Sequence, residues 1–118
     1  MADTPLFPES TRALSEQRKN LAPKQAEAFK AFSQSVFAPG ALDVTTKQLL
    51  AMAAAHVTQC PYCIRGHTKA ALRAGATREE IMEAIWVAAE MRAGAAQAHS
   101  NLALDVMNQV EAQGGAHA

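Results

Sequence analysis

The sequence has none of the features that mark a membrane, secreted or nucleic-acid-binding chain. Neither sign of charge is in excess, since 11 Lys and Arg stand against 11 Asp and Glu in 118 residues. This balance excludes binding of nucleic acid or of anionic membranes through bulk positive charge. No run of about 18 apolar residues occurs, so no membrane span is expected. The first ten residues have an early Asp, two Pro and no apolar stretch, unlike a secretory signal. We therefore expect a cytoplasmic chain.

Aromatic residues and cysteines are also scarce. Aromatic residues make up 5% of the chain, and cysteine occurs twice. In a reducing compartment, two cysteines rarely serve as a structural cross-link. Hydrophobic residues make up 49%, but many of them are alanines, which bury little area each. A lone domain of this size would be marginally stable, so we expect close helix packing or assembly of several subunits.

Strand signals are absent as well, because β-branched and aromatic residues never alternate over a useful length. The apolar spacing is helical nearly throughout. It predicts an all-α fold, with about six helices in one compact domain. We expect this domain at residues 9–113, between a loose arm at 1–8 and a frayed tail at 114–118.

Proline, glycine and capping residues mark the ends of the expected helices. A short helix is expected at roughly 9–20. The other boundaries are, in chain order, Pro23 at a start, Pro39 and Gly40 at an end, Thr45 or Thr46 as a cap, Pro61 at a restart, Gly75 at an end, a capping box at Thr77 and Glu80, and Gly94 between the last two helices.

The segment CPYCIRGH, at residues 60–67, carries the chemistry. A cysteine in the first turn of a helix meets unpaired N–H groups and the positive end of the helix dipole, which favour the thiolate. His67 follows Cys63 by four residues, so both share a helix face and the imidazole can carry a thiol proton. A bridge from Cys60 to Cys63 closes too small a loop to remove much chain entropy. The pair therefore suits a redox switch better than a structural cross-link.

Other interpretations of the motif stay open. The pattern C-x2-C-x3-H offers three zinc ligands, and His56 or His99 could supply a fourth. The two cysteines could also be small buried apolar side chains. A c-type haem is excluded, because Ile64 and not histidine follows the second cysteine.

Further candidates for proton transfer lie outside the motif. His56 lies on an apolar run, and His99 lies on the apolar stripe of the last helix, where a structural histidine is the alternative. Glu90 is a candidate acid on the helix before it, with a solvated or subunit-facing carboxylate as the alternative. Arg65 and Lys69 raise the local positive potential, which favours a thiolate or an acidic partner, unless they are only solvated.

Residues 47–104 resemble the alkylhydroperoxidase D-like, or carboxymuconolactone decarboxylase, family. The resemblance is carried by C-x-x-C-x-x-x-H, the alanine-rich run to A-G-A-T and the capped helix after it. It implies an all-helical fold and assembly as a homotrimer or homohexamer. It also implies reduction of peroxides, or electron transfer from a dihydrolipoyl partner, through the cysteines. Cys60 and Cys63 match the redox pair, and His67 matches the family histidine.

Two positions depart from the family pattern. Gln48 stands where a glutamate is usual, and Tyr62 stands where the peroxidase members have a histidine. Gln48 can form hydrogen bonds but cannot accept a proton, which weakens the proton relay. On one straight helix Gln48 and Cys60 would lie about 18 Å apart. A relay role for Gln48 therefore requires the chain to fold back near Pro61, or a contact from another subunit.

Together these observations predict a thiol-dependent oxidoreductase that reduces a hydroperoxide or a disulfide. A dithiol, or a thioredoxin- or lipoyl-type protein, would re-reduce it. We expect no cofactor beyond a redox-active disulfide between Cys60 and Cys63, no metal, and no nucleic-acid or membrane partner. The alternatives are a non-catalytic redox-sensing or zinc-binding helical oligomer, and a small-acid decarboxylase of the same family. The last would tolerate loss of both cysteines.

Overall fold

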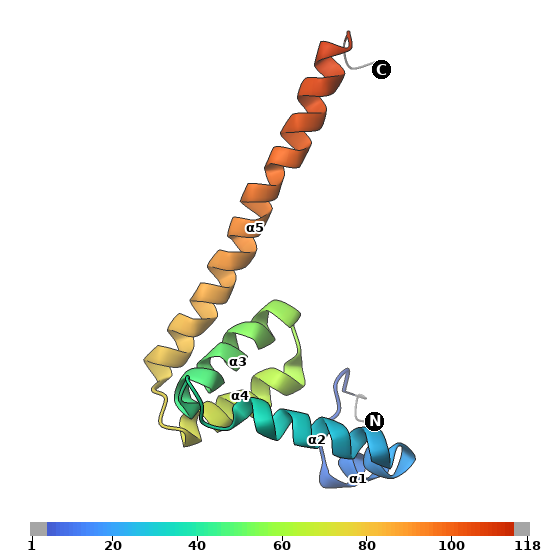
Figure 1. Cartoon of the computed structure of the whole chain (residues 1–118), viewed down its shortest axis with the longest axis vertical. Coiled ribbons are helices and arrows are strands. Elements are labelled where there is room, and N and C mark those ends of the chain that lie inside the picture. The colour runs from blue at the N-terminus through green and yellow to red at the C-terminus, as the bar shows by residue number, and fades with distance from the viewer. Residues whose placement is uncertain (1–4, 115–118) are drawn as a thin grey trace.

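The computed structural model describes residues 5–114, and the regular secondary structure in that range is entirely helical (Figure 1). This confirms the predicted all-α fold class. Five helices replace the six expected: α1 (Arg12–Leu21), α2 (Pro23–Phe37), α3 (Val44–Thr58), α4 (Pro61–Arg73) and α5 (Arg78–Ala112). Residues 5–11 precede the first helix without regular structure. The rest of the expected arm, at 1–4, and of the expected tail, at 115–118, lies outside the described residues.

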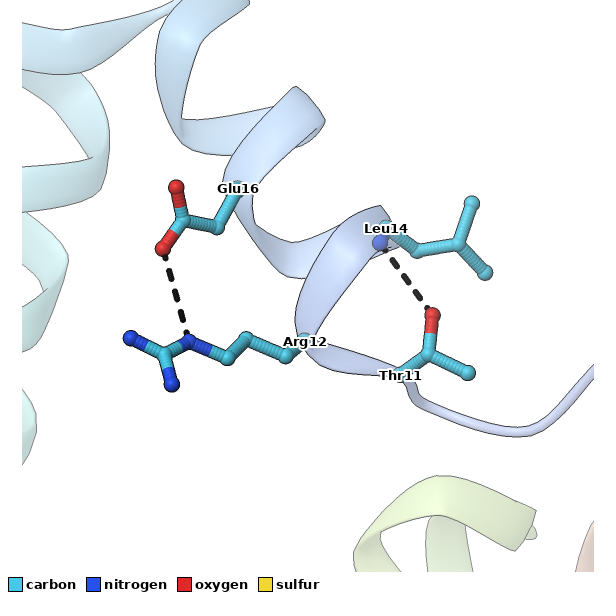
Figure 2. A network of polar contacts seen from close by, with 4 residues as sticks. All are labelled: Thr11, Arg12, Leu14 and Glu16. Carbon is cyan, nitrogen blue, oxygen red and sulfur yellow. Dashed lines mark hydrogen bonds and ion pairs between the residues drawn. The ribbon is translucent and has the colours of Figure 1, made fainter.

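Local interactions define α1 (Figure 2). The hydroxyl oxygen of Thr11 accepts a hydrogen bond from the Leu14 N–H at 3.2 Å, and this cap starts the helix. Arg12 and Glu16, one turn apart, form an exposed ion pair at 3.7 Å. The helix therefore begins at Arg12, a few residues later than the apolar spacing indicated. Pro23 opens α2, as predicted.

A small core holds α3, α4 and the first turns of α5 together. Its buried members are Met52 from α3, Ala71 from α4, and Ala76 and Ile81 around the start of α5. Ala71 is completely buried, and Met52 is 1% exposed. Because alanine is small, α4 approaches α3 closely enough for the flexible Met52 side chain to fill the space between them.

The turn from α4 to α5 follows the sequence signals. Gly75 has φ +97°, the left-handed conformation that favours glycine. The N–H groups of Gly75 and Ala76 donate to carbonyls in the last turn of α4 at 3.1 and 3.0 Å. Thr77 and Glu80 then form the predicted capping box, with hydrogen bonds of 3.1 and 2.8 Å.

The start of α3 differs from the prediction. Asp43, not Thr45 or Thr46, caps this helix, because its carboxylate accepts the Thr46 N–H at 2.8 Å. This hydrogen bond lowers the pKa of Asp43. The Thr45 hydroxyl instead donates to the carbonyl of Ala74 at 2.6 Å, which ties the start of α3 to the end of α4.

The predicted break at Gly94 is wrong, because α5 continues through it. A glycine inside a helix costs only about 1 kcal/mol relative to alanine. Strong helix formers, three alanines among the four residues nearest Gly94, compensate for this cost.

The molecule is elongated because α5 extends beyond the other helices (Figure 1). The radius of gyration is 21.1 Å, whereas a compact chain of this length has about 13–14 Å. Large apolar side chains on the outer part of α5 are exposed, among them Leu102 at 69%. His99 is exposed too, so the stripe expected to be buried there is open to solvent. Within residues 5–114, no helix has both the length and the apolar character to cross a membrane.

Replacing Gly94 with alanine tests the continuity of α5. The new Cβ would meet only the Glu90 carboxylate, at an ordinary 3.5 Å. We expect Gly94→Ala to raise the free energy of unfolding by about 0.5–1 kcal/mol. The measurement is denaturant unfolding at fixed protein concentration. Gly75→Ala is the matched control and should destabilise, because its φ is positive. Destabilisation by Gly94→Ala would contradict a continuous helix.

Candidate functional site

The site is built on a sharp reversal of the chain between α3 and α4. Gln59 adopts the left-handed conformation, with φ 57°, and the Cys60 N–H turns back to the carbonyl of Ala55 at 3.2 Å. Pro61 takes the first position of α4, where its missing N–H leaves no hydrogen bond unmade. The predicted restart at Pro61 is thus confirmed. The reversal lays α4 against α3.

Cys60 is the N-cap of α4. Its sulfur accepts the Cys63 N–H at 3.3 Å, as a serine oxygen does in an ordinary helix cap. Both cysteines are free thiols, and both are half-buried. The cap leaves the Cys60 sulfur facing N–H groups of the first turn, where a negative charge is stabilised.

The two cysteines therefore differ in acidity. The Cys63 thiol and then the Cys63 N–H donate hydrogen bonds to the Cys60 sulfur and lower the pKa of Cys60, and the Tyr62 N–H adds to this effect. The pKa of Cys63 is raised, because its proton is held by the Cys60 sulfur, because it is partly buried, and because the neighbouring thiolate repels a second negative charge. The pair thus favours one thiolate, on Cys60, and one thiol, on Cys63.

His67 is held by Gln48 across the α3–α4 interface. Nδ1 of His67 lies 2.8 Å from Oε1 of Gln48. Because the partner is an amide oxygen, Nδ1 must carry the hydrogen and donate it. The other ring nitrogen, Nε2, is then free to take up a proton. Gln48 is buried, with 7% of its surface exposed, so its orientation is fixed by packing.

An aromatic side chain that the sequence did not single out completes the surroundings of His67. The ring of Phe37, at the end of α2, stacks on the imidazole with 5.1 Å between centroids and 30° between planes. Lys47 holds this end of α2, because its ammonium group donates to the carbonyls of Val36 and Ala38 at 2.8 and 2.6 Å. Phe37 lies 30 positions before His67, so no local pattern could have indicated the contact.

The remaining candidates are not joined to this centre. Nδ1 of His56 lies 2.7 Å from the carbonyl of Met52 in its own helix, a structural partner. Glu90 and His99 are both exposed on α5. Among the residues described, no hydrogen bond connects His56, Glu90 or His99 to either cysteine or to His67. Of the seven predicted site residues, the structure thus joins Gln48 to His67 and Cys60 to Cys63 by hydrogen bonds.

The zinc interpretation finds no support in the arrangement. Within residues 5–114, no three side chains of His, Cys, Asp or Glu gather closely enough to hold a metal ion.

Comparison with known proteins agrees with the fold and with the family resemblance. The model of the carboxymuconolactone decarboxylase family matches residues 23–106, which include α2, α3, α4 and most of α5. The chain belongs to this family. The protein called "uncharacterized protein 4 in cox locus" of Paracoccus denitrificans is 67% identical over 85 residues, which cover 72% of this chain and 77% of that one.

Solved structures give the same result. A protein from Methanobacterium thermoautotrophicum is 37% identical, with a TM-score of 0.67 over 70% of this chain and 93% of its own. A carboxymuconolactone decarboxylase family protein from Legionella pneumophila is 39% identical, with a TM-score of 0.61 over 67% of this chain and 70% of its own. The helical frame around the cysteines of this family member is therefore shared with proteins of known structure.

The difference in acidity predicts which cysteine reacts first with an alkylating reagent. A lowered pKa leaves more thiolate at a given pH, so iodoacetamide should modify Cys60 before Cys63 at neutral pH. The preference should shrink as the pH rises above about 8.5, the usual pKa of a free thiol. Peptide mass spectrometry over a pH series measures both rates. Preferential modification of Cys63 at neutral pH would contradict the assignment.

Proposed function

We propose that this family member is a thiol-dependent oxidoreductase that reduces a hydroperoxide or a disulfide. One observation carries the proposal: the Cys60 sulfur caps the N-terminus of α4, where it accepts the Cys63 N–H at 3.3 Å and its pKa is lowered, and a second thiol follows three positions later. A nucleophile and a resolving thiol in adjacent positions are what a two-electron thiol reductant requires. His67, oriented by Gln48, is the proton carrier.

With a hydroperoxide, the reaction consists of two displacements. The Cys60 thiolate attacks the terminal oxygen, so an S–O bond forms and the O–O bond breaks. The leaving alkoxide takes the Cys63 proton, relayed by His67, and departs as an alcohol. The Cys63 thiolate then attacks the Cys60 sulfur, the S–O bond breaks, and the oxygen leaves as water after taking a proton from solvent. The substrate gains two electrons, and the cysteine pair becomes a disulfide.

With a disulfide substrate, the same groups carry out exchange. Cys60 attacks one substrate sulfur and releases the other as a thiol, which leaves a mixed disulfide. Cys63 then attacks the Cys60 sulfur and releases the second substrate thiol. In both reactions an external dithiol, small or carried by a thioredoxin- or lipoyl-type protein, reverses the bridge by two exchanges. A Cys-x-x-Cys disulfide at the start of a helix stays accessible for this step.

One relative supports a redox role. A carboxymuconolactone decarboxylase family protein of Thermotoga maritima, for which a part in an antioxidative response has been suggested, is 30% identical to this chain. Its TM-score is 0.56 over 76% of this chain and 93% of its own. The family name also refers to decarboxylation of a lactone. That chemistry needs no thiol pair, so the cysteine variants below separate the two activities.

We further propose that the chain assembles with copies of itself as a homotrimer or homohexamer. Few apolar side chains are buried within one chain, while Phe29 and Phe32 on α2 and Trp86 and Leu102 on α5 are each more than 60% exposed. Exposed apolar area of this kind is normally covered in a soluble assembly. The elongated outline of the single chain agrees with this proposal.

Serine variants test the roles of the two cysteines. Serine is a good N-cap, so Cys60→Ser should keep α4 intact, whereas Cys60→Ala should lose about 0.5–2 kcal/mol of stability. We expect either serine variant to lose at least about 99% of peroxide or disulfide reduction with dithiothreitol as reductant, since each role needs its own sulfur. Cys63→Ser should accumulate a sulfenic acid on Cys60 that dimedone traps, whereas Cys60→Ser should not.

Circular dichroism controls for folding of these variants. Trapping by dimedone in Cys60→Ser but not in Cys63→Ser would make Cys63 the attacking thiol and Cys60 the resolving thiol. Full activity on a small organic acid after loss of both sulfurs would replace the redox proposal with the decarboxylase one.

Gln48→Glu tests the relay through His67. A carboxylate at Nδ1 favours the imidazolium form, so His67 would stay protonated at higher pH than it does beside the amide. We expect the alkaline limb of the pH profile of kcat, measured with a hydroperoxide, to shift to higher pH by about one unit. Gln48→Leu should lower kcat without moving the limb, since it removes the hydrogen bond but adds no charge. An unchanged profile in Gln48→Glu would exclude His67 as the proton carrier.

A further inference from the structure

A second face of α4, which carries neither cysteine, borders a cavity of about 720 Å³. The other wall of the cavity is the segment at residues 5–11, which runs along the outside of this helix. The α4 residues that line it are Tyr62, Arg65, Gly66 and Lys69. Their spacing of three or four positions places them on one face of the helix. The proposed reaction does not use any of them.

One part of this cavity is aromatic. Phe7 from the N-terminal segment meets Tyr62 edge to face, with 6.0 Å between ring centroids and 82° between planes. Tyr62 is 39% exposed and Phe7 is 43% exposed, so both rings keep free apolar surface. A ligand with an apolar chain can cover this surface and gain from its burial.

The other part of the cavity is positively charged. Arg65 and Lys69 stand four positions apart on α4 and line the same cavity, so both cationic side chains lie within reach of one ligand. Glu9 also borders the cavity, and it leaves an excess of one positive charge there. Within residues 5–114, Glu9 forms no ion pair with Arg65 or Lys69, because the ion pair in this part of the chain joins Arg12 and Glu16. An anionic group on a ligand fits this end, and a guanidinium holds a carboxylate by two parallel hydrogen bonds.

Gly66 leaves the middle of this face without a side chain. It follows Arg65 directly and lies three positions before Lys69. A Cβ added at Gly66 would meet nothing within 4 Å, so the surface there is open. An alkyl chain can therefore lie along the helix between the aromatic pair and the two cations.

We propose that this cavity is a subsite for an aliphatic carboxylate. The carboxylate pairs with Arg65 and Lys69, and the chain lies over Gly66 against Phe7 and Tyr62. The subsite binds a carboxylate without any redox step, so this inference stands apart from the proposed function.

Binding of an unreactive acid tests the subsite apart from catalysis. Decanoate, below its micellar concentration, is titrated into the reduced full-length protein and followed by NMR or calorimetry, with decanol as the uncharged probe. We expect decanoate to bind more tightly than decanol. The double variant Arg65→Met, Lys69→Met should weaken decanoate binding about tenfold, which is the loss of two partly solvated charge contacts.

Lys24→Met on α2 is the matched control, because Lys24 lies outside this cavity, and it should leave decanoate binding unchanged. Phe7→Ala should weaken decanoate and decanol alike, since it removes apolar surface and no charge. Equal affinity for decanoate and decanol, or a double variant that binds decanoate normally, would overturn the subsite. Absence of any decanoate binding would overturn it too, and would point instead to an acidic segment of a partner protein.

Turnover of an uncharged substrate separates this inference from the proposed function. With cumene hydroperoxide, the double variant should change neither kcat nor KM, because Arg65 and Lys69 take no part in the proposed reaction. A matching fall in kcat would show that the variant disturbs the thiol site, and would overturn a direct contact as the cause of weaker decanoate binding. Wild-type protein that binds decanoate through Arg65 and Lys69 but reduces no hydroperoxide would refute the redox proposal while the subsite stands.

Discussion

The reversal of the chain at Gln59, Cys60 and Pro61 is the constraint on which the rest of the site depends. It places a sulfur at the N-cap of α4, where a capping oxygen is usual, and so exposes that sulfur to N–H donors of the first turn. The same reversal returns α4 along α3, so that His67 meets Gln48 although 19 positions separate them. Without it, 19 positions along one straight helix would keep Gln48 and His67 about 28 Å apart. The left-handed conformation of Gln59 costs free energy, because this residue is not glycine. Such backbone strain is often found at functional sites, where the surrounding structure holds the chain in a single conformation.

Within that frame, hydrogen bonding gives two chemically identical side chains different roles. Cys60 accepts from the N–H and the thiol of Cys63, and its pKa falls, while Cys63 keeps its proton and its pKa rises. In the proposed reaction, the proton that the leaving group needs is therefore held by the sulfur that later becomes the second nucleophile. If the two thiols had equal pKa values, neither would ionise in preference to the other, and both could not ionise together because two neighbouring thiolates repel each other. The asymmetry arises from the position of the pair at the helix start rather than from any further charged residue.

Much of this could be predicted from the sequence, because the signals are local. Proline at the first position of α2 and α4, the glycine turn after α4, and the Thr77 and Glu80 box are short-range interactions that the chain fixes by itself. The cysteine motif and its register with His67 belong to the same class. The break expected at Gly94 was wrong, because a cost of about 1 kcal/mol does not end a helix in which alanines flank the glycine. Phe37 escaped for the opposite reason, because it reaches His67 from another helix and tertiary packing alone decides such a contact. Gln48 was a candidate through the family pattern, and its contact with His67 depends on the fold-back near Pro61.

The amide at position 48 has consequences of its own. A buried carboxylate beside His67 would need a compensating proton or charge, and it would hold the imidazole in its charged form. Gln48, at 7% exposure, avoids that cost and still fixes the tautomer, since its oxygen can only accept from Nδ1. In the proposed reaction, the relay then has one mobile proton, supplied by Cys63, and no second proton held by a carboxylic acid. Chemistry that needs a single proton for each displacement is compatible with this arrangement, as both peroxide reduction and disulfide exchange are. A reaction that needs a separate, permanently charged base is not.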